Sequence, residues 1–202
     1  MNRYIAAFFI IVFSSFASFC KGQDVKDTID NTYPQYVLLI YGMPSGGVYL
    51  TAKRVVAERW GIQFIRVGDC VVSRGTRDSA SANNSIVNKK LEEKYGIGWR
   101  KEFNKQVDKE YKRQEKIIRF VNSEKIVKNK QAEMSDKGGL DYEFQPIEGT
   151  TEYYVWVNGW VAFNNEVDWG SYYTFRVNYK TKKVVLLSDV PERRKHPALY
   201  ND

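Results

Sequence analysis

The hydrophobic pattern of this chain changes its period near Leu140, and this change limits the possible folds more than any other feature. Before Leu140, apolar residues recur at helical spacing in three segments. We interpret these segments as helices over residues 48–60, 77–95 and 99–121. After Leu140, apolar and polar residues alternate in four short segments that turn residues separate, a pattern typical of strands. These strands are expected at 142–144, 153–157, 173–177 and 184–187.

Two further apolar runs flank the first helix. Residues 36–41 and 62–72 read as strands, with Gly68 at a bulge or bend in the second. A strand, a helix and a second strand in succession form a possible parallel crossover, whereas the short links after Leu140 indicate an antiparallel meander. The polar stretch 122–139 is expected to be a connection. The sequence therefore predicts an α+β fold, in which an N-terminal strand-helix-strand and two further helices pack on a C-terminal four-stranded antiparallel meander.

The first 22 residues have the order of a secretory signal peptide. Arg3 supplies the positive start, and residues 4–19 are almost entirely apolar or serine. Cleavage after Gly22 suits the small-residue rule, as does cleavage after Ala17, and lipidation at Cys20 would require cleavage after Phe19. We expect export to the periplasm or the exterior, with a membrane association only if Cys20 is lipidated or the signal is retained.

Composition indicates one globular domain of ordinary size. We expect a tether over 23–34, a single α+β domain over 35–190 and a charged tail over 191–202. The formal charge is +7, and much of the excess lies between Arg100 and Lys130, where both signs alternate. Such alternation is typical of a solvated helix face. Because no recognition motif accompanies it, nucleic acid is not an expected partner, and attraction to an anionic envelope surface is favoured instead.

One segment resembles a known group of proteins. The run Leu91-Glu92-Glu93-Lys94-Tyr95-Gly96-Ile97-Gly98-Trp99, continued by Phe103 and Val107, resembles the FEKKY-domain group of uncharacterised exported proteins of Bacteroidota-type bacteria. The stretches 57–62 and 68–72 are similar to that group too, so the resemblance covers about residues 50–110. It implies an exported protein and no known activity.

Candidate chemical sites are few, and each has a simpler structural interpretation. Cys70 would need a base to act as a nucleophile, and because the only histidine is His196 in the tail, we expect Cys70 to be a small core residue. Asn164, Glu166 and Asp168 alternate like calcium ligands, but the glycine comes one position late, which favours a hairpin loop. We therefore predict no catalytic residue, no cofactor and no metal site.

Aromatic residues crowd the strand region and suggest a binding face. Period two sends Tyr153, Val155 and Val157 to a buried face, expected to pack on the 99–121 helix through residues Phe103, Val107 and Tyr111. The possible binding face on the other side consists of Tyr154, Trp156, Trp169 and Tyr172.

These observations favour a non-enzymatic function. The expected protein is an exported binding or envelope-associated protein whose partner is an acidic or glycan-like envelope component. The alternative is a periplasmic or secreted hydrolase with a site that the sequence does not reveal.

Overall fold

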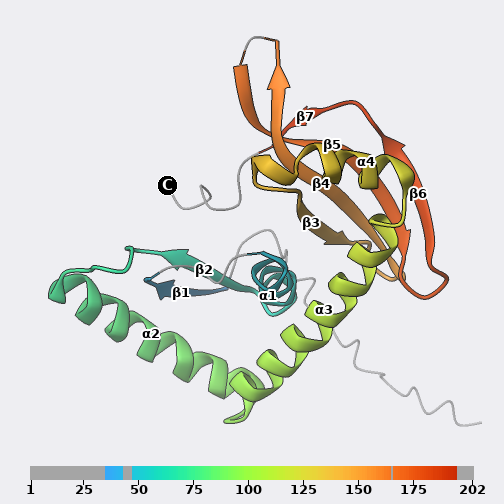
Figure 1. Cartoon of the computed structure of the whole chain (residues 1–202). Helices are drawn as coiled ribbons and strands as arrows, with labels where there is room; N and C mark the ends of the chain where they lie inside the picture. The colour runs from blue at the N-terminus through green and yellow to red at the C-terminus, as the bar shows by residue number, and fades with distance from the viewer. Residues whose placement is uncertain (1–34, 43–46, 165, 195–202) are drawn as a thin grey trace, which may run out of the picture. The chain divides into compact units, whose positions relative to one another are not determined.

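The chain forms an α+β fold in which a parallel strand pair and helices are followed by an antiparallel sheet (Figure 1). The structure is a computed structural model, and it describes residues 35–42, 47–164 and 166–194. The predicted signal peptide, Cys20, the tether and His196 lie outside these residues. The first half of the fold consists of β1 (Tyr36–Ile40), α1 (Val48–Arg59), β2 (Ile62–Arg66), α2 (Arg74–Tyr95) and α3 (Trp99–Val121). The second half consists of α4 (Lys125–Glu133), the short 3-10 helix η1 (Ser135–Lys137), β3 (Asp141–Pro146), β4 (Glu152–Phe163), β5 (Glu166–Asn178), β6 (Lys183–Ser188) and β7 (Glu192–Arg193).

The predicted strand-helix-strand unit is present. β1 pairs with β2 in parallel, with Tyr36 opposite Ile62 and Ile40 opposite Arg66. α1 provides the connection, since parallel neighbours cannot be joined by a tight turn. β2 ends at Arg66, so the strand predicted over 62–72 is too long, and Gly68 follows the strand instead of forming a bulge in it.

Helix α2 covers the free edge of β1. The Asn84 side chain bonds both backbone groups of Leu39: its Oδ1 accepts from the amide at 2.8 Å and its Nδ2 donates to the carbonyl at 2.7 Å. Asn83 Nδ2 donates to the Val37 carbonyl at 3.0 Å. An uncovered strand edge is a template for unwanted pairing, and these two amides occupy it. The helix begins three residues before its predicted start because the Ser73 hydroxyl accepts from the Thr76 amide as an N-cap.

The C-terminal sheet is the predicted meander, in the order β3-β4-β5-β6 with all neighbours antiparallel. Two expectations need correction here. The stretch 122–139 is not merely a connection, because it contains α4, whose Val127 is buried against the sheet. The predicted tail also begins too early, because β7 pairs with β5 within it. Gly170 of β5 permits that pairing, since a Cβ there would lie 2.6 Å from the Glu192 carbonyl oxygen.

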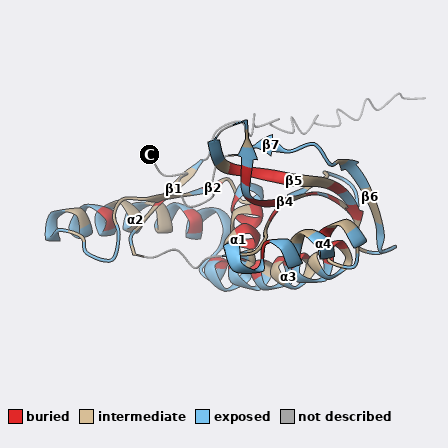
Figure 2. Ribbon diagram, turned by 45° about the horizontal axis from the view of Figure 1, so that its top comes forward, coloured by how far each residue is buried: buried red, intermediate tan, exposed pale blue. Residues whose placement is uncertain are grey.

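The hydrophobic interior consists of two clusters, and α3 contributes to both. Trp99, Phe103 and Val107 pack with the N-terminal unit, while Ile117 and Val121 pack with the sheet. The expected burial of Tyr153, Val155 and Val157 is confirmed, and Figure 2 shows buried residues along β4 and β5. Their predicted partners were wrong, because Phe103, Val107 and Tyr111 pack on the N-terminal unit and the sheet packs on the later turns of α3.

Among the residues that the structure describes, no helix combines the length and the apolar character needed to cross a membrane.

Candidate functional site

The face of the sheet that points away from the sheet's own apolar cluster carries two adjacent aromatic rings, one exposed and one half-buried. Tyr154 and Trp156 alternate along β4 with the buried Tyr153 and Val155, so strand geometry places them on the opposite face. Tyr154 is 36% exposed and Trp156 is half-buried. Their ring centroids are 6.2 Å apart with an interplanar angle of 38°. The pair forms a small aromatic surface that a flat ligand can contact.

Two arginines border this aromatic pair and share one carboxylate. Glu143 lies opposite Trp156 in the β3–β4 register, with a side chain that is 11% exposed. Arg54 of α1 donates to Glu143 Oε1 at 3.0 Å, and Arg194 donates to Glu143 Oε2 at 2.8 Å. The Arg194 guanidinium also lies over the Trp156 ring, 4.2 Å from its centroid. We call Tyr154, Trp156, Glu143, Arg54 and Arg194 the outer cluster.

The position of Arg194 depends on the pairing of β7 with β5. The Arg194 amide donates to the Trp169 carbonyl at 2.9 Å, which continues the ladder beyond β7. The preceding Arg193 donates to Asp168 Oδ2 at 2.9 Å and to Glu166 Oε2 at 3.2 Å, and its guanidinium lies over the Phe163 ring. Because successive strand residues point to opposite faces, fixing Arg193 on one face directs Arg194 to the other, beside Trp156.

The predicted binding face is assembled only in part. Tyr154 and Trp156 lie on one face as expected. Trp169 is only 8% exposed, and its ring meets Trp160 edge to face at 5.5 Å, while Trp160 is 49% exposed. Trp169 is therefore not an exposed member of the predicted face.

Tyr172 was also wrongly assigned to this face. A register shift at Val157/Asn158 makes Tyr172 an extra residue of β5, so the simple alternation fails there. Its hydroxyl contacts the sulfur of Met134 at 3.5 Å, and the ammonium of Lys130 lies 4.7 Å from its ring centroid. Tyr172 thus faces α4.

Two other candidates from the sequence have different outcomes. Cys70 is exposed, so the prediction of a core cysteine was wrong: β2 has already ended and Cys70 lies in the loop before α2. The hairpin between β4 and β5 is confirmed. The calcium hypothesis would need oxygens of Glu166 and Asp168 as metal ligands. Oxygens of both carboxylates accept hydrogen bonds from Arg193 instead. The described part of the chain contains no group of three histidine, cysteine, aspartate or glutamate residues that could hold a metal ion.

A second polar cluster, buried between α1, α3 and β4, was missed by the sequence reasoning. Glu110 of α3 is 1% exposed and accepts from the Tyr153 hydroxyl at 2.9 Å and from Arg113 at 2.8 Å. Arg59 donates to the same carboxylate at 3.3 Å. Burial, and next the negative charge of Glu110, raise the pKa of Tyr153.

The neighbouring amide of Gln114 extends this cluster. It donates to Glu110 Oε1 at 3.2 Å and accepts from the Thr51 hydroxyl at 2.7 Å. Because the Glu110 carboxylate is enclosed by these donors and is only 1% exposed, the cluster supports packing. A signal for it was present in the sequence: Phe103, Val107, Glu110, Gln114 and Ile117 follow one another at spacings of three and four, which places the two polar residues on the buried stripe.

Comparisons with protein-family models, with curated proteins and with solved structures returned no match for this chain. The function is therefore argued from the surfaces described above.

Proposed function

We propose that this chain is an exported, non-enzymatic binding protein that recognises an acidic glycan of the bacterial envelope through the outer cluster. The observation that carries the proposal is the Tyr154–Trp156 pair, of which Tyr154 is exposed and Trp156 is half-buried, with two arginines at its border. An aromatic ring offers a flat apolar surface to the C–H face of a sugar ring, and a guanidinium offers paired donors to a carboxylate. The outer cluster combines both within one patch.

The charge of the outer cluster favours an acidic ligand. Arg54 and Arg194 together carry two positive charges against the single carboxylate of Glu143, which leaves a net charge of +1. Each guanidinium has five N–H donors and uses one of them on Glu143, so donors remain for a ligand carboxylate. The stacking of Arg194 on Trp156 holds its planar group in place, which reduces the ordering cost of binding.

Export of the chain, its membership of the FEKKY-domain group and its envelope location belong to the same proposal. Arg3 followed by the apolar run over 4–19 supports export, and the run over 91–99 supports the group.

The test is affinity electrophoresis in native gels that contain polygalacturonate, an acidic glycan, or dextran, a neutral one. We expect polygalacturonate to retard the chain more than dextran does. Trp156→Ala should abolish most of the retardation, whereas Tyr41→Ala, which removes a more exposed aromatic ring from the loop after β1, should leave it unchanged. Arg54→Gln should reduce the retardation by polygalacturonate alone.

Stability measurements separate binding from folding in this experiment. Trp156 is half-buried, so its replacement by alanine should cost about 1–2 kcal/mol, less than the ~3–5 kcal/mol typical of a fully buried large aromatic residue. If neither glycan retards the chain, or if Trp156→Ala unfolds it, the outer cluster is not a glycan site.

A further inference from the structure

The solvent face of α3 carries a straight row of cations, which we call the lysine ridge. Its members succeed one another at steps of three or four residues and are all exposed. They are Lys101, Lys105, Lys109, Lys112, Lys116 and Arg119. At 1.5 Å per residue the row extends about 27 Å along the helix. The ridge lies opposite the stripe that Phe103, Val107 and Ile117 bury, so packing leaves it open to solvent, as the pale blue of α3 in Figure 2 shows.

The acidic residues of α3 do not interrupt the ridge. At 100° per residue, the exposed acidic residues Glu102, Asp108 and Glu115 fall on its two flanks. Glu102 accepts from Gln106 and Glu115 accepts from the Tyr111 hydroxyl, so both carboxylates have local partners. Among the described residues only Lys105 of the ridge forms an ion pair, with Glu102 at 3.6 Å. The two signs alternate along the sequence, which suggested a merely solvated face, but the helix places the cations on one face and the acidic residues on its flanks.

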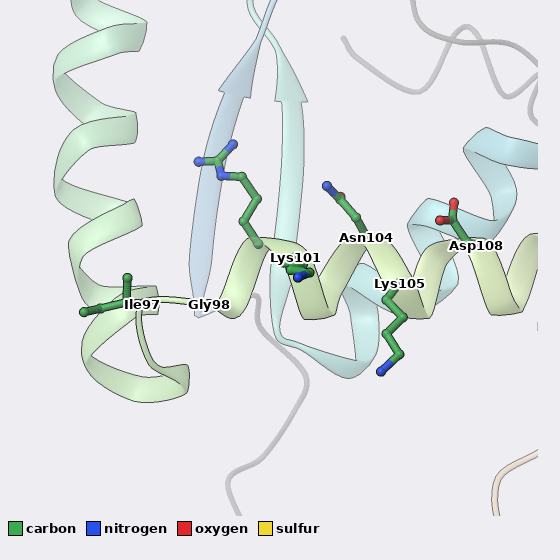
Figure 3. Close-up of a pocket in the computed structure, with 7 residues that line it drawn as sticks. Ile97, Gly98, Lys101, Asn104, Lys105 and Asp108 are labelled. Carbon is green, nitrogen blue, oxygen red and sulfur yellow. The ribbon is translucent and has the colours of Figure 1, made fainter.

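An exposed apolar residue stands at the N-terminal end of the ridge. Ile97, in the turn before α3, is 91% exposed. It shares a shallow hollow with Lys101, Lys105 and Asp108, which Figure 3 shows in close-up. A lone aliphatic side chain gains nothing from a nucleic-acid backbone, but it gains free energy on entering the headgroup layer of a membrane.

We propose that the lysine ridge binds an anionic phospholipid surface, with Ile97 entering the headgroup layer. Lysines suit a surface of many mobile phosphates because each is a point charge on a long stem and needs no fixed partner geometry. The straightness of the ridge matches a flat surface, and Phe120, the ring beside Lys116, is half-buried against the sheet cluster and so offers no open platform for stacked bases. This inference goes beyond the proposed glycan binding, which depends on the outer cluster of the sheet.

The test is sedimentation with vesicles of equal parts phosphatidylglycerol and phosphatidylcholine, and with vesicles of phosphatidylcholine alone. The protein is the chain isolated from an exporting bacterial host, with its N-terminus established by intact mass. We expect binding to the anionic vesicles that falls steeply with added salt, and weak binding to the neutral ones. The triple change Lys105→Gln, Lys109→Gln and Lys112→Gln should lower the affinity about a hundredfold, since each cation near such a surface contributes about fivefold.

Matched controls distinguish the ridge from net charge. Lys89→Gln, Lys90→Gln and Lys180→Gln together remove the same charge from exposed positions on α2 and after β5, and should lower the affinity only slightly. Replacing the three ridge lysines by arginine should keep the binding, and circular dichroism should show all variants folded. Ile97→Ser should lower the affinity severalfold while leaving the salt dependence unchanged.

Several results would overturn the proposal. Equal losses in the ridge and control triples would show that only net charge matters. Equal binding to neutral vesicles would show that the phosphates of anionic lipids are not recognised. If duplex DNA displaces the chain from the anionic vesicles and Ile97→Ser has no effect, the ridge is a general polyanion site and the lipid assignment is wrong.

Discussion

The two halves of the fold bury their strands in different ways. The parallel pair β1–β2 has only two strands and depends on helices for its stability: α1 connects it, α2 covers its edge through Asn83 and Asn84, and α3 packs on it through Trp99 and Phe103. The antiparallel sheet β3–β6 pairs each strand with its neighbour in the chain and needs helices on one face only. The parallel pair is thus stabilised by helices from other parts of the sequence, whereas each strand of the meander pairs with the next strand in the chain.

Helix α3 connects these halves, and the middle of its buried stripe is polar. We call the residues there, Glu110 and Gln114, the joint. The first turns of α3 lie in the N-terminal cluster and its last turns lie under the sheet, and between them Glu110 and Gln114 replace apolar residues on the buried stripe. The Glu110 carboxylate bonds Arg59 from the N-terminal half and Tyr153 from the sheet. Such bonds are directional, so they set the orientation of one half relative to the other more strictly than apolar contact does.

The largest expected effect tests whether the halves unfold separately. Phe103→Ala in the first cluster and Phe175→Ala in the second should each lower the free energy of unfolding by about 3–5 kcal/mol. Because α3 belongs to both clusters, we expect either change to lower the hydrogen-exchange protection of amides in both β2 and β5.

The control for this pair is Ile86→Ala on the exposed side of α2, which should leave protection nearly unchanged. If Phe103→Ala lowers protection in β2 but not in β5, the two halves are independent folding units and the joint at Glu110 does not couple them.

The same comparison explains what the sequence could and could not predict. The meander was predicted from alternating residues and short links, and the strand-helix-strand unit from two apolar runs that flank a segment of helical periodicity. Helix α4 was missed because its stretch is mostly polar, and only Val127 is buried. Tyr172 and Trp169 were misassigned because strict alternation ignores a bulge and cannot tell which of two contacting aromatic rings is covered.

The polar clusters were missed for a different reason. Glu110 lies on the apolar stripe of α3, but a carboxylate in a lysine-rich helix reads as a solvent-exposed residue until its partners are known. Those partners come from Arg59 and Tyr153, which are 51 and 43 residues away in the chain. Arg194 was likewise assigned to a charged tail, and only the pairing of β7 with β5 brings it to Trp156.

A smaller effect is expected at the joint itself. Glu110→Gln leaves Arg59 and Arg113 without their buried anionic partner, while the Tyr153 hydroxyl keeps an acceptor. Removing one member of a buried ion pair costs about 3–5 kcal/mol, and because both arginines reach solvent we expect a loss of about 2–3 kcal/mol in urea denaturation. Glu115→Gln, an exposed change on the same helix, should shift stability by less than about 0.5 kcal/mol. Equal stability of Glu110→Gln and the parent would show that the charge at the joint contributes nothing.

The smallest effect distinguishes the sheet from the N-terminal half by its response to alkali. Burial raises the pKa of Tyr142 to about 12 from an ordinary value near 10, and its hydroxyl donates to Asn122. The unfolded chain therefore releases this proton first as the pH rises. The free energy of unfolding should be constant below about pH 10 and should fall by about 2 kcal/mol towards pH 12, with Tyr153 adding to the loss.

Tyr142→Phe should cost about 1 kcal/mol at neutral pH, where the bond to Asn122 is lost, and should make the alkaline decline shallower. Urea denaturation at a series of pH values measures both effects. Tyr41→Phe, an exposed hydroxyl outside the sheet, should leave the decline as steep as in the parent. A decline equally steep in Tyr142→Phe would mean that the alkaline sensitivity arises outside this tyrosine, and the assignment of that sensitivity to the sheet would be wrong.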